Sequence, residues 1–392
     1  MNGSSDDSRA KICIVVAVPW QVNVFMSQHI VALSHRYRVT LALNGSKHEL
    51  RPELRGITLM PIPIVRPISP LRDLLALFVL WRLFRRERFD IVQSMSPKAG
   101  LLSAVAGRVA GVPIRIHWIT GQIWGNKRGL MRVLLKTMDR ITARCATNLL
   151  ADSPSQVKFL VEENNCASKQ VEVLGSGSTC GVDMSRFHPD PVVRARVRKS
   201  LGIPDDATIA LFLGRKQPEK GIPELCEAFL SASKACPKIH LLMVGPDEAG
   251  MEEFVRNTLA PVADNLSWIG LTSIPEEYLV ASDFLVLPSH REGFGSVVIE
   301  AAACGIPSIG TNIYGLSDAI IDGETGILVP IRNTIALEVA IKRLALDACE
   351  RVKMGERAIA RVSEKFSQEV LVNALLDYYS RLLTKAKTAR AK

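Results

Sequence analysis

Two glutamates, Glu292 and Glu300, stand eight positions apart in the stretch HREGFGSVVIEA, residues 290–301. Two glycines and an apolar run that begins at Val297 lie between them. Glycines permit a tight turn close to a ligand, and serine is a frequent helix N-cap. The pattern predicts a loop that carries Glu292, then a helix capped by Ser296 with Glu300 one turn inside it. The plain alternative is a loop charge and a solvated helix residue.

The start of this helix has the properties of an anion site. Its first backbone N–H groups, around Gly295, Ser296 and Val297, have no partner within the helix and carry the positive end of its dipole. Glu300 shares a helix face with Ser296, and a carboxylate there can accept hydrogen bonds from a vicinal diol such as ribose. These residues predict a binding site for a nucleoside diphosphate.

Cations in a second segment strengthen this interpretation. In LFLGRKQPEKGIPELCEAF (211–229), an apolar strand ends at Gly214, Arg215 follows, and Lys220 comes just before another helix. Arg and Lys at the carboxyl end of a strand suit a phosphate group. The alternative is that both are solvent-facing loop charges.

Paired carboxylates also serve glycosidases, as an acid and a nucleophile or base that flank one sugar. Here both glutamates belong to one loop–helix unit amid groups suited to phosphate, which disfavours that chemistry.

Short β-branched and apolar runs that alternate with helical patterns must position these residues. In the first half, strands are predicted at 11–18, 38–44, 56–64, 89–95, 114–120 and 147–153. The pattern then restarts, with strands at 208–214, 239–245, 266–270, 283–289, 307–312 and 326–330. Such runs indicate parallel sheets covered by helices on both faces.

The chain length of 392 residues favours two domains. A proline- and charge-containing link, 183–206, lies between the halves. We predict an N-terminal domain over 1–188, a C-terminal domain over 189–365 and a final helix with a basic tail over 366–392. Both domains are α/β, doubly wound and Rossmann-like. Ligands of such sheets bind beyond the carboxyl ends of the strands, so we expect the active site in a deep cleft between the domains.

The charge is strongly asymmetric. Residues 1–150 hold 22 Lys and Arg against 8 Asp and Glu, while residues 151–392 hold 27 against 31. A front half with a net charge of +14 suggests an anionic partner. We expect no nucleic acid, because the basic half lacks the corresponding motifs.

Other function classes are disfavoured by composition. The eight cysteines are scattered without metal-site spacing, which favours a reducing cytosol and no zinc site. No apolar stretch is long enough to cross a bilayer, and the polar N-terminus is unlike a signal peptide.

Taken in order, GRKQPEKGIPELCEAF, MVGPDE, and the long segment 271–330 with its two glutamates resemble the retaining glycosyltransferases of family 4. VLGSGSTCGVDMSRFHP (173–189) matches the segment that leads into their second domain. The resemblance covers essentially the whole chain and implies the GT-B fold, with two Rossmann-like domains and a last helix, within 366–392, that crosses back to the N-terminal domain.

The resemblance also assigns roles in binding a nucleotide-diphosphate sugar, which is a substrate, so that no cofactor and no metal are expected. It implies that Arg215 and Lys220 hold the diphosphate and that Glu300 binds the ribose. Glu292 would face the sugar. The implied donor-binding set is Gly214, Arg215, Lys220, Glu292, Gly293, Phe294, Gly295, Ser296, Val297 and Glu300.

The front half should select the acceptor. Lys98 begins a small-residue helix after a strand, and is either an anion-binding residue or a surface lysine. Family members commonly carry a histidine directly before a glycine where this chain has HWITG. Here Thr120 precedes Gly121, so either His117 reaches the donor sugar or Thr120 takes that role.

The segment RPISPLRDLLALFVLWRLFRRERF (66–89) contains many large apolar side chains and six arginines, among them Arg66. It is either a basic amphipathic surface for anionic lipid or a helix packed on the sheet with a solvated arginine end.

The stretches IVRPISPLRD, MSPKAGLL and RIHWITGQIWGNKRG also resemble bacterial family members that extend polyprenyl-diphosphate-linked glycans. The resemblance therefore implies a metal-independent, retaining hexosyltransferase of surface polysaccharide synthesis. We expect it to transfer an N-acetylated hexose-type sugar from a UDP donor to an undecaprenyl-diphosphate-linked glycan. We expect it in the cytoplasm, peripheral on the inner face of the plasma membrane. The alternatives are a transferase for a soluble acceptor, a UDP-sugar 2-epimerase of the same fold, and a catalytically silent sugar-nucleotide-binding protein.

Overall fold

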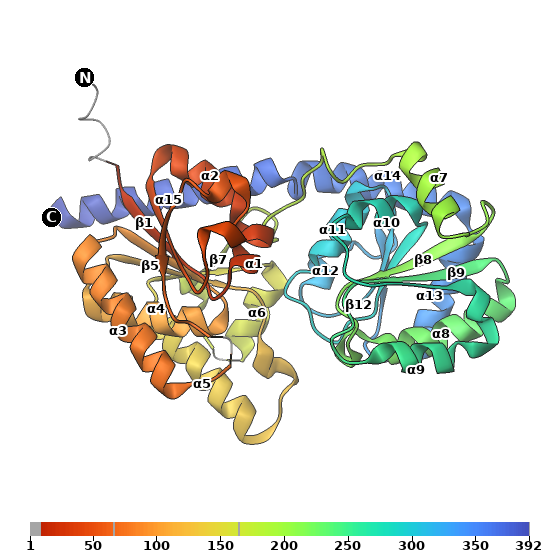
Figure 1. The fold of residues 1–392 in the computed structure, drawn as a ribbon, viewed down its shortest axis with the longest axis horizontal. Coiled ribbons are helices and arrows are strands. Elements are labelled where there is room, and N and C mark those ends of the chain that lie inside the picture. The colour runs from red at the N-terminus through yellow and green to blue at the C-terminus, as the bar shows by residue number, and fades with distance from the viewer. Residues whose placement is uncertain (1–8, 66, 164, 392) are drawn as a thin grey trace. The chain divides into compact units, whose positions relative to one another are not determined.

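The computed structural model describes residues 9–65, 67–163 and 165–391 (Figure 1). The chain forms two compact units. Unit 1 comprises Met1–Cys180 and Gln368–Lys392, and unit 2 comprises Gly181–Ser367. The chain thus changes unit after Cys180 and again after Ser367, several residues earlier and slightly later than the boundaries suggested by the sequence.

Unit 1 is built on a seven-stranded parallel sheet in the order β3-β2-β1-β4-β5-β6-β7. Six strands occur where apolar runs predicted them, each one to five residues shorter. The seventh, β7, is three residues long and was not predicted. The strands are β1 (Lys11–Val15), β2 (Arg38–Leu43), β3 (Thr58–Pro61), β4 (Ile91–Met95), β5 (Ile114–Ile119), β6 (Asn148–Ala151) and β7 (Val171–Val173).

Helices cover both faces of this sheet, as the alternation along β1 shows. Ile12 and Ile14 pack in the core beneath α2 and α15, whereas Cys13 and Val15 pack in the core beneath α3 and α4. The helices of unit 1 are α1 (Pro19–Gln21), a π-helical turn (Val22–Met26), α2 (Ser27–Arg36), α3 (Pro70–Glu87), α4 (Pro97–Ala110), α5 (Gly129–Cys145), α6 (Pro154–Glu162) and α15 (Gln368–Ala391).

The C-terminal helix α15 is part of unit 1. Leu371 and Leu375 are buried in its core, and the Tyr379 hydroxyl donates to Gln93 Oε1 of β4 at 2.5 Å. Arg381 pairs with Glu172 of β7 at 2.5 Å. The last helix of the chain therefore packs on the sheet that contains the first strand, β1.

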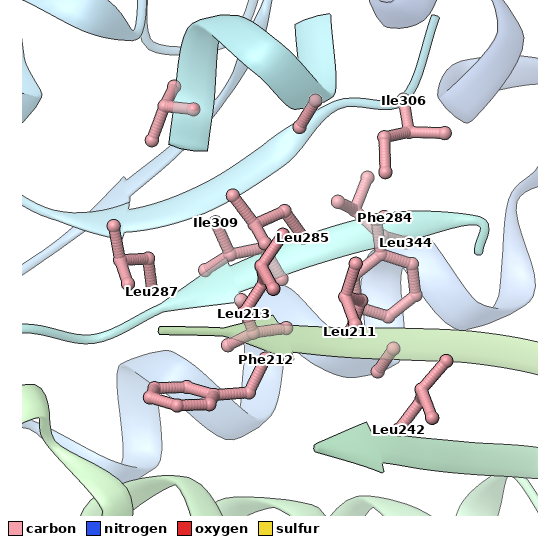
Figure 2. Close-up of a cluster of buried hydrophobic side chains, with 14 of the residues drawn as sticks. Leu211, Phe212, Leu213, Leu242, Phe284, Leu285, Leu287, Ile306, Ile309 and Leu344 are labelled. Carbon is pink, nitrogen blue, oxygen red and sulfur yellow. The ribbon is translucent and has the colours of Figure 1, made fainter. Parts of the chain in front are cut away.

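Unit 2 contains a six-stranded parallel sheet in the order β10-β9-β8-β11-β12-β13. All six strands lie inside the runs that predicted them. Figure 2 shows apolar side chains of β8 and β11 packed with those of neighbouring elements. The strands are β8 (Thr208–Leu213), β9 (Ile239–Val244), β10 (Leu266–Ile269), β11 (Phe284–Leu287), β12 (Ser308–Thr311) and β13 (Gly326–Val329).

The segment 183–206, predicted to link the two domains, belongs to unit 2. It contains α7, which packs against α10. The helices of unit 2 are α7 (Pro191–Ser200), α8 (Ile222–Ala235), α9 (Met251–Thr258), α10 (Pro275–Ala281), α11 (Ser296–Ala303), α12 (Leu316–Ala319), α13 (Thr334–Leu346) and α14 (Ala348–Lys365).

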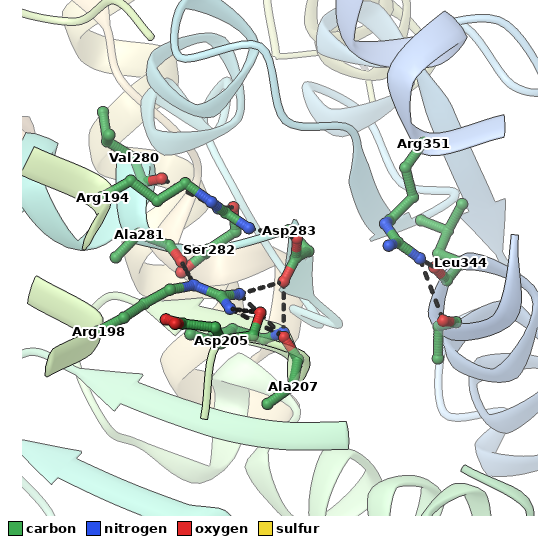
Figure 3. A network of polar contacts seen from close by, with 12 residues as sticks. Arg194, Arg198, Asp205, Ala207, Val280, Ala281, Ser282, Asp283, Leu344 and Arg351 are labelled. Carbon is green, nitrogen blue, oxygen red and sulfur yellow. Dashed lines mark hydrogen bonds and ion pairs between the residues drawn. The ribbon is translucent and has the colours of Figure 1, made fainter. Parts of the chain in front are cut away.

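A buried ion cluster attaches α7 to the sheet (Figure 3). Asp283, just before β11, accepts from Arg198 at 2.7 Å, from Arg194 at 2.7 Å and from the backbone N–H of Ile209 at 2.6 Å. Arg198 is only 3% exposed and also donates to the carbonyl of Ala207 at 3.0 Å. These bonds explain why charged residues of the supposed link lie inside the fold.

Two alternatives were predicted for 66–89, a helix packed on the sheet and a basic amphipathic surface, and helix α3 has features of both. Arg66 lies outside the described residues. Its inner side packs on the sheet through Ala76, Leu80, Leu83 and Phe84. Its outer side nevertheless exposes large apolar side chains in the first half and arginines in the second. Within the described part of the chain, no helix is both long and apolar enough to span a membrane.

Candidate functional site

The predicted donor residues come together where the strand order of unit 2 reverses. From β8 the chain proceeds outward to β9 and β10, and from β11 it proceeds the other way to β12 and β13. The loops after β8 and β11 therefore leave adjacent strands in opposite directions. A crevice at such a switch point is where open α/β sheets bind ligands.

Two glycines make this geometry possible. Gly221, which precedes α8, has φ +73°, and a Cβ there would lie 2.1 Å from the carbonyl oxygen of Pro288 at the end of β11. Gly295, which precedes α11, has φ +80°, and a Cβ there would lie 2.5 Å from Leu316. Only glycine allows both loops to approach their neighbours this closely.

Lys220 and Glu292 form an ion pair between the two loops. The Lys220 Nζ lies 2.6 Å from Glu292 Oε1, and each side chain is 13% exposed. The Ser289 hydroxyl donates to the same oxygen at 2.7 Å. Within the described part of the chain, Glu292 Oε2 accepts no hydrogen bond. The pair holds a cation and a carboxylate oxygen in fixed positions at the switch point.

Arg215 is placed differently. It follows Gly214, whose N–H donates to the carbonyl of Val244, and its guanidinium pairs with Glu248 at 3.2 Å. Both side chains of this pair are about half exposed, at 49% and 45%. Such a pair contributes little to stability, so the guanidinium can exchange Glu248 for another anion with little loss.

The start of α11 corrects one expectation. Gly295 is the N-cap and no side chain caps the helix, while Ser296 is its first residue. The N–H groups of Ser296 and Val297 thus remain available as donors, while that of Val298 donates to the carbonyl of Gly295 at 2.8 Å. The preceding loop is fixed because Phe294 is buried and packs on Phe366, with ring centroids 5.3 Å apart.

Glu300 is partly buried one turn into α11. Burial raises the pKa of its carboxyl to about 7, Arg186 opposes this rise and Glu276 adds to it. Arg186 is itself held by Glu276 at 2.6 Å and by the carbonyl of Ser273 at 3.0 Å. Glu300 therefore titrates near neutral pH, in a site with one neighbouring cation.

Sequence reasoning missed Lys216, the residue between Arg215 and Gln217. Its side chain is fully buried, its Nζ donates to the carbonyl of Ile269 at 2.6 Å and lies 3.6 Å from the centroid of the Trp268 ring. Burial lowers the pKa of this ammonium to about 8. Nothing in the spacing distinguishes it from a loop lysine, since its partner is a backbone atom of a distant strand.

The expected acceptor residues lie in unit 1. Lys98 at the start of α4 pairs with Asp73 of α3 at 2.7 Å and also donates to the carbonyl of Pro67, so its charge is already compensated. Thr120 and Gly121 directly follow β5 and are partly buried.

His117 lies inside unit 1. Its ring contacts the Ser94 hydroxyl at 3.0 Å and packs so closely under α4 that a Cβ on Gly100 would lie 2.3 Å from it. Burial lowers the pKa of His117 to about 4, so the ring is neutral at pH 7.

Among the described residues, no group of three or more His, Cys, Asp or Glu side chains is arranged to hold a metal ion. The donors gathered in unit 2 are cationic and backbone N–H groups, which suit an anion.

Two family profiles match the chain. One, described as glycosyl transferases group 1, covers residues 193–361, and the other, described as a glycosyl transferase 4-like domain, covers residues 22–177. The chain is 31% identical over 331 residues to the capsular polysaccharide biosynthesis glycosyltransferase CapM of Staphylococcus aureus, covering 83% of this chain and 86% of CapM.

A second relative is the UDP-Gal:alpha-D-GlcNAc-diphosphoundecaprenol alpha-1,3-galactosyltransferase of Escherichia coli. It is 26% identical over 321 residues, which are 81% of either chain. Among solved structures, HepE from Anabaena in complex with UDP and glucose superposes with a TM-score of 0.78 at 17% identity, covering 95% of this chain and all of HepE.

These matches define the class: the chain is a glycosyltransferase with the GT-B fold, as the resemblance predicted. It belongs to the family 4 type found among bacterial polysaccharide glycosyltransferases.

Proposed function

We propose that this enzyme transfers a hexose-type sugar, N-acetylated as expected from the sequence, from a UDP donor to a polyprenyl-diphosphate-linked glycan. The observation that carries the proposal is the Lys220–Glu292 pair beside the open start of α11, at the switch point of unit 2. A donor and a lipid acceptor of these kinds are named for the E. coli relative, and a role in capsule synthesis for the S. aureus relative.

In the proposed reaction, the bond between the anomeric carbon and the diphosphate oxygen breaks. The acceptor oxygen bonds to that carbon on the same face, and its proton passes to the departing diphosphate. Negative charge grows on the leaving group, so Lys220, Arg215 and the first N–H groups of α11 stabilise the transition state. This arrangement supports a metal-independent reaction with retention.

Glu292 and Glu300 take separate roles in this proposal. Glu292 Oε1 orients Lys220, while Oε2 accepts from a hydroxyl of the donor sugar. Glu300 accepts from the ribose hydroxyls. Acceptor contacts come from unit 1, where Thr120 and Gly121 follow β5, and the enzyme works at the inner face of the plasma membrane, where its acceptor is anchored.

The test uses the full chain, a panel of UDP-, GDP- and dTDP-sugars, and a water-soluble short-chain prenyl diphosphate that carries one GlcNAc. We expect a disaccharide product only with a UDP-sugar, with unchanged yield in EDTA and a retained anomeric configuration by NMR. Lys220→Ala and Glu300→Ala should abolish transfer while circular dichroism shows an intact fold. Undiminished turnover in either variant would refute the assignment.

Conversion of the donor alone would instead identify a 2-epimerase. Transfer to free sugars in preference to the prenyl-linked acceptor would identify a soluble-acceptor enzyme.

A further inference from the structure

Helix α5 in unit 1 presents an apolar stripe to the outside. Leu130 is 89% exposed, Val133 63% and Leu134 45%, and Ile141 continues the same side two turns later. Residues spaced by three, four and seven positions share one helix face. An ordinary surface helix turns its polar face outward, so exposed apolar side chains in this number are unusual.

Three charged residues of α5 are held by neighbouring elements of unit 1. Arg132 donates to both carboxylate oxygens of Glu163 at 2.9 Å, and Lys136 pairs with the same carboxylate. Asp139 accepts from the indole nitrogen of Trp124 at 2.7 Å. Trp124 itself is buried. These contacts fix the rotation of the helix, so the outward stripe is a defined feature of the fold.

The one polar side chain within the stripe is satisfied by its own helix. The Thr137 hydroxyl donates to the carbonyl of Val133 at 2.8 Å. A threonine bonded in this way presents its methyl group and needs no partner from water. The stripe from Leu130 to Ile141 can therefore be buried without leaving this hydroxyl unpaired.

Helix α3 carries a second stripe of the same kind. Leu71, Leu74, Leu75 and Phe78, at 53% to 83% exposure, follow the same spacing over its first two turns. Both α3 and α5 pack against α4, and the three lie on one side of unit 1 in Figure 1. The two helices that carry the stripes thus flank α4 on one side of the unit.

Positive charge surrounds these stripes. Lys127 and Arg128 are exposed immediately before α5, and Arg82, Arg85 and Arg86 are exposed in the second half of α3. Apolar side chains bordered by Lys and Arg are what an anionic bilayer interface accommodates. A second copy of the chain is a poor occupant, because two such basic faces would repel one another.

We propose that the outward faces of α5 and α3, which we call the α3–α5 stripe pair, insert into the interfacial region of an anionic bilayer. This inference rests on the proposed function. Docking on the membrane would bring unit 1 to an acceptor that is anchored there.

The experiment compares Leu130→Gln/Leu134→Gln with a matched control, Ile335→Gln/Val339→Gln. The control pair has the same spacing on α13 of unit 2 and is exposed by 74% and 59%. Sedimentation with phosphatidylglycerol–cardiolipin vesicles should show binding of the wild type and of the control. The α5 variant should partition roughly tenfold or more weakly, because two apolar side chains no longer enter the interface. Vesicles of phosphatidylcholine should bind all three proteins less.

Transfer assays separate this inference from the proposed function. The α5 variant should lose transfer to an acceptor embedded in vesicles and keep wild-type transfer to the water-soluble short-chain acceptor. Vesicle binding without transfer to either acceptor by the wild type would refute the proposed function and support the docking surface.

Equal vesicle binding by the α5 variant and the control would overturn the inference. So would a wild-type dimer in sedimentation velocity that the α5 variant loses, since the stripe would then be covered by a second copy.

Discussion

Replacing Glu300 with glutamine should change how the stability of unit 2 depends on pH. Burial raises the pKa of this carboxyl from 4.5 to about 7. The neutral form is therefore favoured in the fold, and the resulting stability is complete below pH 4.5 and disappears as the pH rises through about 7. At about 1.4 kcal/mol for each pH unit between these values, ionisation costs the folded protein about 3 kcal/mol.

Urea unfolding followed by circular dichroism between pH 5 and 8 measures this effect. The free energy of unfolding of the wild type should fall relative to that of Glu300→Gln by up to about 3 kcal/mol over this range. Glu356→Gln, a change at an exposed position on α14, serves as the control and should follow the wild type. Parallel profiles for the wild type and Glu300→Gln would refute the reasoning.

Three further predictions concern the elements around the site. Asp283→Asn leaves the buried Arg198 guanidinium uncompensated and should destabilise unit 2 by about 3 to 5 kcal/mol, measured by urea unfolding, whereas a loss below about 1 kcal/mol would contradict a buried cluster. Gly221→Ala places a Cβ against Pro288 and should weaken UDP binding in calorimetry at least tenfold (~1.4 kcal/mol); unchanged affinity would show that the loop adapts. Lys220→Met should lower kcat more than it raises KM, because charge on the leaving group grows in the transition state, and an effect on KM alone would argue for ground-state binding only.

The sheets were predictable from sequence because parallel strands buried on both faces are continuous apolar runs. The β7 strand was missed because VEV is short and its neighbours are polar and glycine-rich. The 183–206 segment was misread for a related reason. Its charged side chains form ion pairs inside unit 2. Arg198 pairs with Asp283, which lies 85 residues away in the sequence, so local composition does not reveal the contact.

In the site, sequence reasoning found residues that share a loop or a strand end. It anticipated both segments that meet at the switch point, because in each a loop with charged residues and glycines follows an apolar strand. It did not anticipate that Lys220 would pair with Glu292 or that Arg215 would pair with Glu248, since these partners come from different loops. It also assigned the cap of α11 to Ser296, where the positive φ of Gly295 sets the helix start.

The two cations expected to share one role are therefore unequal. Arg215 is half exposed and held by an exposed carboxylate, so an incoming diphosphate can compete for it at little cost. Lys220 is mostly buried, and removing Glu292 would leave its charge without compensation. In the proposed reaction, Glu292 therefore keeps this desolvated ammonium in place before the donor binds. Glu292, which the resemblance placed facing the sugar, thus also holds the ammonium of Lys220, a role that the sequence did not reveal.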